Sequence, residues 1–596
     1  MRTMTRALFA TVAVAALALT GCTSGGAGSQ SGQTKGSADT GDEQLTPRSS
    51  VNVQERKSIE EGGDLHMAIS ALPITYNVRN VLGNTVDLAK TIGPFVQPSN
   101  FIYSDDGTFV VNPNFLKDFS VEHADGEEPQ VVTLTLAEEA VWGDGTPITW
   151  EDYEATWKAC NGQQSAPSSE DASEGEEGDE GGSGDVFLCA SKDGWDYVKS
   201  VEAGATDHEV VVTYHEAYPD WSATLASVAP KAGVASPELF NEGWSTPNND
   251  WFAGPYQFAS VDEAQKLITL EKNPAWWGNE GMLDSITFKV MDPSQMADAF
   301  ANGDIDVLTD IVDADQYLAA ETRADGEVRH ALATQWRQFT FNGEAENLGS
   351  KEVRQAIVMG IDREKIVEAD MAGIPNISTK ELVLGNHFFM PGQQGYKNNG
   401  LDYAYDPERA KEALEDAGWV LEEGADYRTK DGKTLEFDYR VIQSFPTSKN
   451  EGEELKEQME ALGVKVNFVD VEADVFFEEV AEGNFGLVSF AWEGGPYPMA
   501  NISQIYSCEE VAPDGQNYSR ICDERIDELS AAVAEEINEE ERLKLANEAD
   551  ETIWENAMVL PLYQRVDLTA VPKSLANYGA FGMSSVIPEN VGFLKK

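Results

Sequence analysis

The segment Trp492-Glu493-Gly494-Gly495-Pro496-Tyr497-Pro498 holds the residue types best suited to bind a small ligand. Its two aromatic rings offer flat apolar faces, its carboxylate suits an ammonium group, and its glycines leave backbone N–H groups open to a carboxylate. We expect a strand to end at Ala491, so that this segment lies beyond the carboxyl end of the strand, where open α/β sheets bind ligands. A β-turn with a packed tryptophan is the alternative interpretation.

No familiar catalytic or metal-binding motif occurs in the sequence. There is no His-Glu-x-x-His, no Gly-x-Ser-x-Gly and no glycine-rich phosphate loop ahead of a lysine. Paired carboxylates carry no information about glycosidase chemistry, because 104 acidic residues make chance pairs certain. We therefore expect a protein without enzymatic activity, cofactor or metal. The six histidines are scattered without the spacing of metal ligands: His66, His123, His208, His215, His330 and His387.

Alternating apolar residues and helix-capping signals predict the elements that position the candidate segment. Strands are expected over residues 436–442, 464–471 and 485–491, with helices over 452–462 and 475–481 between them. Such a βαβαβ run builds a parallel sheet.

Two further helices are predicted from their first residues. Thr149 followed by Asp152 is a capping-box signature for a helix from Trp150, after a strand over 130–136. Asp406-Pro407 places an N-cap and a first-turn proline ahead of a second helix.

Five cysteines become four candidates for disulfides once Cys22 is assigned to lipid attachment. Of the three possible pairings we favour the two local ones, Cys160 with Cys189 and Cys508 with Cys522. Each short loop would contribute about 3 kcal/mol by restricting the unfolded chain. A zinc site is the alternative, although no Cys-x-x-Cys spacing supports it.

The N-terminus has the layout of an export signal. Arg2 and Arg6 precede an apolar run over 7–19, and Leu19-Thr20-Gly21-Cys22 matches the cleavage site of bacterial lipoproteins. We expect a signal peptide over 1–21 and a lipidated, flexible linker over 22–60, rich in Ser, Gly, Gln and Thr. An ordinary signal peptide with a chance cysteine is the alternative.

The formal net charge of −62 restricts the possible partners. Loss of the two signal-peptide arginines would leave −62 − 2 = −64 on the mature chain. Such a field repels nucleic acid and anionic lipid, so we expect no nucleic-acid partner. Residues 165–185 carry eight acidic residues among Gly and Ser and are expected to form a disordered loop. A calcium loop is the alternative there, without the regular Asp spacing that it needs.

Several short motifs, in their order along the chain, carry a family resemblance. The sequence resembles the bacterial extracellular solute-binding proteins of the oligopeptide and dipeptide type, over nearly everything from Asp64 to Gly592. The shared pattern is Trp142-Gly143-Asp144-Gly145-Thr146-Pro147, Gly254-Pro255-Tyr256, Glu271-Lys272-Asn273-Pro274, Gly303-Asp304-Ile305-Asp306, Phe341-Asn342, Val353-Arg354-Gln355-Ala356, Ile361-Asp362-Arg363, Tyr405-Asp406-Pro407 and Ala417-Gly418-Trp419.

This resemblance implies an α/β fold: a two-lobed clamp with an extra N-terminal subdomain and mixed sheets with flanking helices. Lobe I would cover residues 61–334, lobe II 335–558, and residues 559–596 would return to lobe I. In the peptide-binding members a Trp and an Asp hold the amine of the ligand. Trp492 matches that Trp, the Asp position falls near Gly495, and Glu493 is the candidate substitute. Gly254, Tyr76 and Asn342 complete the candidate ligand contacts that the resemblance implies.

The function that the resemblance implies is that of the substrate-binding lipoprotein of an ABC transporter. It would capture short peptides outside the membrane, deliver them to the permease subunits, and act as a monomer anchored by the lipid on Cys22 to the outer face of the cell membrane. An oligosaccharide, a metal chelate or another small solute is the alternative ligand. A secreted hydrolase and a structural surface protein are the alternatives from other classes.

Overall fold

The computed structural model describes residues 46–122, 129–162, 186–192, 194–442, 444–473, 475–512 and 515–596. The chain divides into two compact units, Met1–Glu43 and Gln44–Lys596, and only the second contains described residues. The predicted export signal, Cys22 and the acidic stretch 165–185 therefore lie outside the described residues. None of the helices in the described part is long and apolar enough to cross a membrane.

The end of the predicted linker packs against the C-terminal part of the chain. Ser50 forms a β-bridge with Ala580, and Ile59 is fully buried and bridges Leu594. The flexible segment predicted over residues 22–60 therefore does not extend to its predicted end. Backbone hydrogen bonds and the burial of Ile59 hold this last stretch in place.

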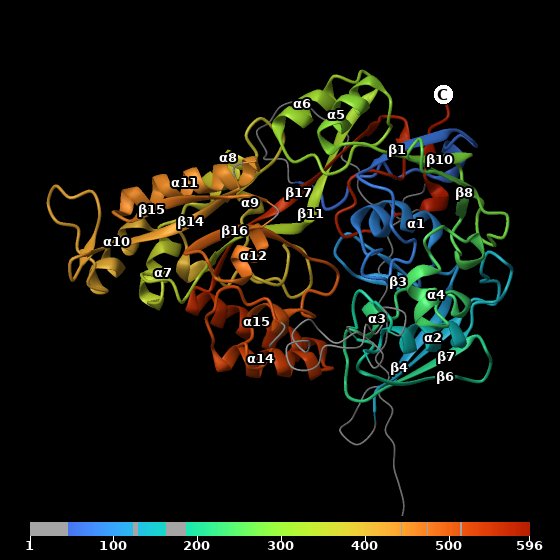
Figure 1. Ribbon diagram of the computed structural model, residues 1–596, viewed down its shortest axis with the longest axis horizontal. Helices are drawn as coiled ribbons and strands as arrows, with labels where there is room; N and C mark the ends of the chain where they lie inside the picture. Colours follow the sequence, from blue (N-terminus) through green and yellow to red (C-terminus); the bar gives the residue numbers. More distant parts are fainter. Residues whose placement is uncertain are drawn as a thin grey trace, which may run out of the picture. The chain divides into compact units, whose positions relative to one another are not determined.

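Two long strands organise the largest sheet. β11 (Gly326–Phe341) and β17 (Val559–Pro572) pair antiparallel over most of their lengths and lie side by side in Figure 1. The sheet continues from β11 through β16 (Leu487–Glu493) and β14 (Glu436–Ile442) to β15 (Lys465–Val471). β14 is parallel to both β15 and β16, which confirms the parallel sheet predicted from the βαβαβ pattern.

Three boundaries of this predicted run are wrong by two residues or more, and one of them is the start of β16, at Leu487 instead of residue 485. Helix α11 (Pro446–Leu462) begins six residues before the predicted start at 452, because a proline occupies its first turn. Strand β16 continues past Ala491 to Glu493, because Trp492 and Glu493 pair with Trp336 and Gln335 of β11. Helix α12 (Phe476–Ala481) lies close to its predicted position.

The pairing of β11 with β17 shifts register twice, and the larger of the two interruptions lies near its middle. Leu332 pairs with Val566 and Trp336 with Gln564, so residues 333–335 lie opposite Arg565 alone. Such a bulge bends a strand and re-aims the side chains beside it. The backbone carbonyl of Ala333 accepts a hydrogen bond from the Gln564 side chain (2.7 Å) within this bulge.

A four-stranded sheet in the first half of the chain has the order β1 (Asp64–Ile69), β10 (Ser285–Val290), β9 (Leu267–Lys272) and β8 (Tyr256–Asp262). Only the β1–β10 pair is parallel. Buried side chains of this sheet, such as Leu65, Ile268 and Phe288, pack against the short helix α1 (Gly93–Val96).

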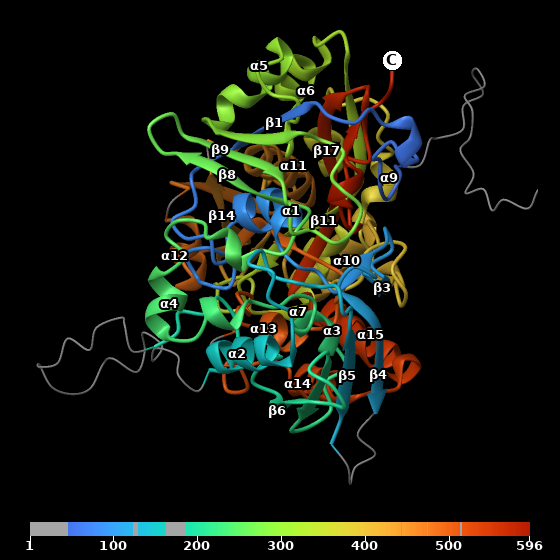
Figure 2. The same ribbon diagram turned by 90° about the vertical axis from the view of Figure 1, so that its right-hand side faces the viewer.

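A second four-stranded sheet, at the bottom of Figure 2, has the order β4 (Leu116–Glu122), β5 (Val131–Leu136), β7 (Glu209–Tyr214) and β6 (Val198–Ala203). Helix α2 (Trp150–Cys160) begins where predicted, since the Asp152 carboxylate accepts a hydrogen bond from the Thr149 N–H at 2.9 Å. This hydrogen bond, from the N-cap backbone to the side chain three residues later, is one of the two that define a capping box, and it fixes the start of the helix.

Both favoured disulfides are formed: Cys160 bonds to Cys189 and Cys508 to Cys522. The first ties the end of α2 to the segment after residue 185, and the second closes a short loop ahead of α14 (Glu524–Glu535). Because Cys508 and Cys522 are bonded to each other, the nearby Asp527 does not complete a metal site with them.

The remaining elements are short or flank these sheets, and the helix predicted after Asp406 is α10. They are α3 (Trp221–Thr224), α4 (Pro237–Glu242), α5 (Pro293–Asn302), α6 (Ala314–Glu321), α7 (Lys351–Met359), α8 (Arg363–Asp370), α9 (Thr379–Leu382), α10 (Pro407–Asp416), α13 (Ile502–Tyr506), α15 (Glu539–Asn556), β2 (Phe101–Tyr103), β3 (Phe109–Val111), β12 (Thr429–Lys430), β13 (Lys433–Thr434), β18 (Leu575–Ala576), β19 (Gly592–Phe593), the π-helix η2 (Asp87–Ile92) and the 3-10 turns η1 (Arg56–Ser58), η4 (Lys231–Gly233), η5 (Asn249–Trp251), η6 (Leu401–Tyr403) and η7 (Pro588–Asn590).

A buried ion pair fastens β11 to α11. The Arg337 guanidinium donates to both carboxylate oxygens of Glu451, at 2.7 and 2.5 Å, and the carboxylate is fully buried. We expect Glu451→Leu to lower the free energy of unfolding by about 3–5 kcal/mol, because it leaves a guanidinium buried without a counter-charge.

Urea unfolding measures this loss. The control is Glu436→Gln on β14, whose pair with Lys465 is 40% exposed on both sides and should contribute less than about 1 kcal/mol. Equal losses in the two variants would contradict a structural role for the buried pair.

Candidate functional site

A cavity of about 1180 Å³ lies where the β11–β17 bulge meets the end of β16. Its walls come from residues 78–115 on one side, from 493–497 on another, and from the bulge and residues 565–589. This volume exceeds the usual 300–1,000 Å³ of small-molecule pockets, so the cavity has room for a ligand of several linked groups.

Four of the predicted contact residues line this cavity together: Glu493, Gly494, Gly495 and Tyr497. Gly494 must be small, because a Cβ there would lie 2.9 Å from the Thr334 carbonyl oxygen, which also accepts the Gly494 N–H. Gly495 has open space on its Cβ side, and its carbonyl accepts a hydrogen bond from Gln393. Their binding roles remain predictions.

Glu493 is already engaged by two neighbours. Its Oε1 accepts hydrogen bonds from the Lys90 ammonium and the Thr334 hydroxyl, each at 2.6 Å. Burial alone would raise the pKa of Glu493, but these two donors outweigh it and hold the pKa below its ordinary value. The carboxylate therefore stays charged at neutral pH and already holds one ammonium group.

Tyr497 joins two distant segments of the chain. Its hydroxyl lies 2.9 Å from the Tyr103 hydroxyl and donates to the Ser222 hydroxyl at 3.0 Å. Burial, followed by the nearby Tyr103, raises the pKa of Tyr497 far above its ordinary value, so the hydroxyl remains a neutral donor. No local sequence signal links these three residues, which are separated by more than 100 positions.

Trp492 is not among the residues that line the cavity. As successive residues of a strand, Trp492 and Glu493 point to opposite faces of the sheet. The tryptophan ring packs edge-on against Phe490 and stacks on Tyr518 at 6.2 Å. This position corresponds to the packed tryptophan of the alternative interpretation, although its role in binding stays a prediction.

Tyr76, Gly254 and Asn342 also lie outside the cavity lining. Tyr76 is 2% exposed and packs against Phe258. Gly254 allows a close approach of two backbones, because a Cβ there would lie 2.3 Å from the Phe95 carbonyl oxygen. Asn342 follows the far end of β11, seven residues after Gln335. At a rise of about 3.3 Å per residue, this places it about 23 Å along the strand from the cavity wall.

Aromatic side chains make up much of the cavity wall. Sequence reasoning did not select them, because they are spread over several short segments with no shared spacing. They are Phe95, Phe101, Tyr103, Phe115, Trp276, Tyr578 and Phe581.

The charged groups of the lining are few and of both signs. Arg79, Lys90 and Arg565 supply the cations, and Asp310, Glu493, Asp567 and Glu589 supply the carboxylates. Asp567 is the most perturbed of the acids. Burial raises its pKa to about 6, and the nearby Asp310 adds to the rise, against hydrogen bonds from Thr569 and the Phe581 N–H.

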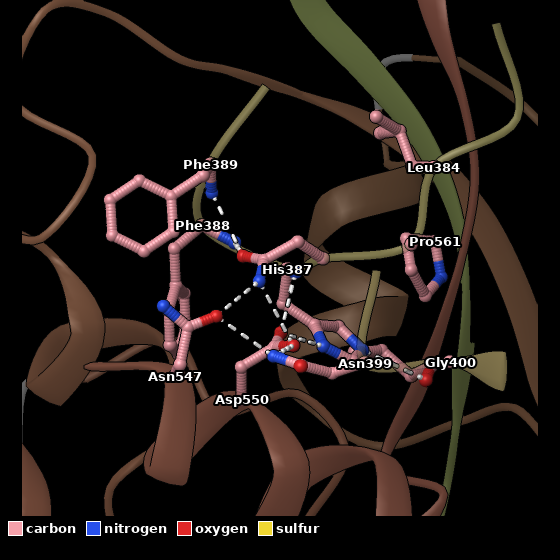
Figure 3. Close-up of polar contacts among 12 residues, drawn as sticks. Leu384, His387, Phe388, Phe389, Asn399, Gly400, Asn547, Asp550 and Pro561 are labelled. Carbon is pink, nitrogen blue, oxygen red and sulfur yellow. Dashed lines mark hydrogen bonds and ion pairs between the residues drawn. The ribbon is translucent and has the colours of Figure 1, made fainter. Parts of the chain in front are cut away.

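The arrangement closest to a catalytic dyad lies elsewhere, between His387 and Asp550 (Figure 3). His387 Nδ1 lies 2.7 Å from Asp550 Oδ1, and both side chains are fully buried. The other ring nitrogen faces the Val559 carbonyl oxygen at 3.3 Å, and Asn386 and Asn399 donate to Asp550 Oδ2. With a backbone carbonyl where a nucleophile would stand, this pair is placed to hold the fold together.

Known proteins resemble this chain in both sequence and fold. The profile of bacterial extracellular solute-binding proteins, family 5 (middle part), matches residues 121–512. The chain is 32% identical over 591 residues to the oligopeptide-binding protein OppA of Mycobacterium tuberculosis, covering 98% of this chain and 93% of that protein.

Two solved structures share the fold. The periplasmic EDTA-binding protein EppA superposes with a TM-score of 0.77 at 23% identity, covering 94% of this chain and all of that one. AppA from Bacillus subtilis, in complex with a nonapeptide, superposes with a TM-score of 0.64 at 20% identity, covering 90% and 100%. These likenesses confirm the predicted two-lobed α/β fold class.

The raised pKa of Asp567 makes a prediction about stability. Between its ordinary pKa of 3.8 and about 6, the folded protein binds a proton that the unfolded chain has already lost. Stability contributed by this residue is therefore present below pH 4 and lost as the pH rises to about 6. We expect Asp567→Asn to remove this loss of stability. The melting temperature of the variant minus that of the unmodified protein should therefore be larger at pH 7.5 than at pH 4.5.

Thermal unfolding at the two pH values measures this difference. Asp304→Asn, which makes the same change at an exposed carboxylate, is the control and should leave the pH dependence unchanged. A constant difference between Asp567→Asn and the unmodified protein at both pH values would contradict the prediction.

Proposed function

The chain belongs to family 5 of the bacterial extracellular solute-binding proteins, and on this basis we propose that it captures short peptides and delivers them to an ABC permease. The observation that carries the proposal is the large cavity with Glu493–Tyr497 on one wall and residues 78–115 on the other. The 32% identity to an oligopeptide-binding protein over almost the whole chain supports the peptide ligand.

The cellular setting is part of the same proposal. The family is extracellular by its own description, and the Leu19-Thr20-Gly21-Cys22 sequence supports attachment to the outer face of the membrane by a lipid on Cys22. The protein would act as a monomer whose task ends with ligand release to the permease, without chemical change of the ligand. The lobes that close on the ligand would be residues 61–334 with 559–596, and residues 335–558.

Three contacts between these proposed lobes support a clamp that closes. Lys90 reaches Glu493, Tyr497 reaches Tyr103 and Ser222, and Arg542 forms a bidentate pair with Asp220 at 2.9 and 2.5 Å. A ligand that binds this arrangement better than an open one shifts the population toward it.

An oligosaccharide or a metal chelate is the second candidate ligand. The aromatic wall suits sugar rings, and the fold is shared with an EDTA-binding protein. The peptide is favoured because Glu493 presents a charged carboxylate that already holds the ammonium of Lys90, which is the chemistry of an amine site.

The amine site can be tested at Glu493. We expect Glu493→Gln to weaken binding of a peptide with a free N-terminus by about tenfold, because a charge-assisted hydrogen bond to the ammonium is lost. Binding of the N-acetylated form of the same peptide should change less than twofold. Peptides that the protein retains from a mixed digest are prepared in free and N-acetylated form, and calorimetry measures the affinity of each form. Glu457→Gln, which removes the same charge on the exposed face of α11, is the control. Equal losses for the free and acetylated peptides would reject the amine site.

The buried pair between Asp220 and Arg542 predicts a kinetic effect. Its side chains are 10% and 4% exposed, so Asp220→Asn leaves a buried guanidinium without its full counter-charge in the closed form. We expect the closed form to lose about 2–5 kcal/mol, and the bound peptide to dissociate correspondingly faster.

Stopped-flow tryptophan fluorescence measures that rate. Glu151→Gln breaks the half-exposed pair with Lys231 within one lobe and serves as the control, with little change expected. An unchanged dissociation rate in Asp220→Asn would show that the pair does not hold the lobes together.

A further inference from the structure

Arg79 is an uncommitted cation in the cavity wall. Its backbone is fixed, since its N–H donates to Asn77 Oδ1 and its carbonyl accepts the Ala190 N–H. Among the described residues, its guanidinium has no hydrogen-bond or ion-pair partner, and it faces the cavity. Five donors of one side chain are therefore left open toward the space where a ligand would lie.

The fully buried arginines in the described part of the chain have several partners each. Arg337 holds Glu451, and Arg542 holds Asp220. Arg354 donates to four backbone carbonyls around residues 348–349 and 556–557. The fold thus satisfies buried guanidinium groups elsewhere, so the open group at Arg79 is an exception within this molecule.

The surroundings of Arg79 leave it available to a ligand. Its side chain is half-buried, and burial lowers the pKa of Arg79 to about 10, so the group is still a cation at neutral pH. The chain has 104 acidic residues against 42 basic ones, yet none of the described carboxylates pairs with it.

A second open group lines the same cavity. The side-chain amide of Gln97, after α1, has no hydrogen-bond partner among the described residues, and its nitrogen is buried. A guanidinium and an amide together present many donors and match the two oxygens of a carboxylate.

We propose that Arg79 binds a carboxylate of the ligand, so that the ligands of this protein carry at least one carboxylate. This inference rests on the proposed function and specifies its ligand class: peptides recognised through a free C-terminus or an acidic side chain. Glu493 and Arg79 then select the two charge types of such a ligand separately.

Two synthetic libraries of the same tetrapeptides test this, one with free C-termini and one amidated, each with a free N-terminus. Full-length protein is loaded with each library, washed, and the retained peptides are quantified by mass spectrometry. We expect the free-acid library to be retained about tenfold more than the amidated one, and Arg79→Gln to abolish that preference. If the carboxylate comes instead from side chains, Asp- and Glu-containing peptides are enriched from the amidated library, and Arg79→Gln abolishes that enrichment.

Two controls separate binding from folding. Arg409→Gln removes an exposed arginine on α10 and should keep the preference of the unmodified protein. Arg79→Gln should keep the melting temperature, because no protein group loses a partner, whereas a structural arginine would lower it.

The possible failures are distinct. Retention of both libraries to the same extent, without acidic enrichment, overturns the carboxylate site and leaves peptide capture intact. A preference that survives in Arg79→Gln also overturns it. If neither library is retained by the unmodified protein, peptide capture fails, and the carboxylate site fails with it.

Discussion

The break in pairing between β11 and β17 is the constraint on which the cavity depends. Residues 333–335 stand opposite a single residue, Arg565, so their backbone bends out of the ladder. Within this bulge the Thr334 hydroxyl donates to Glu493. The Thr334 carbonyl accepts the Gly494 N–H, which continues the β11–β16 ladder by one residue, so both contacts fix the end of β16 beside the bulge.

Charge is distributed unevenly between the surface and the cavity. The chain as a whole is strongly acidic, and several of its exposed lysines have a carboxylate beside them, as in the pairs Lys397–Glu551 and Lys433–Glu346. Within the cavity wall the cations are fewer than the acids, yet Arg79 has no acid beside it. Arg354 and Arg363 also lack an acid, but backbone carbonyls accept their hydrogen bonds, whereas Arg79 has neither kind of partner among the described residues.

The sequence predicted the repetitive parts of this structure and missed those that depend on distant pairing. The βαβαβ run was readable because its apolar residues alternate with period two in the strands and its helices end at glycine. The disulfides were readable because local loops left few choices. The end of β16 could not be predicted, since its last two residues belong to the strand only because they pair with β11.

That small error had a large effect on the predicted site. In a loop, Trp492 and Glu493 could both face a ligand, but in a strand they face opposite sides. Arg79, Lys90 and Thr334 were missed for a related reason: each is an ordinary residue in its own segment. Their importance arises only when three distant parts of the chain meet, and no local pattern encodes that meeting.

Beyond the bulge, β11 and β17 are tied to the helices that cover them. Immediately beyond the bulge, Arg337 is fixed to Glu451 on α11, and Tyr563 of β17 donates to Asp370 of α8 at 2.9 Å. Burial, followed by the Glu451 charge, raises the pKa of Asp370 well above its ordinary value, so a proton there relieves the repulsion between two buried carboxylates. This network ties β11 and β17 to their covering helices from residue 337 onward. Residues 333–335 lack regular partners on the β17 side only, because on the β16 side Gln335 pairs with Glu493 and the Thr334 carbonyl accepts the Gly494 N–H. The cavity wall is therefore anchored through β16 where its pairing with β17 is broken.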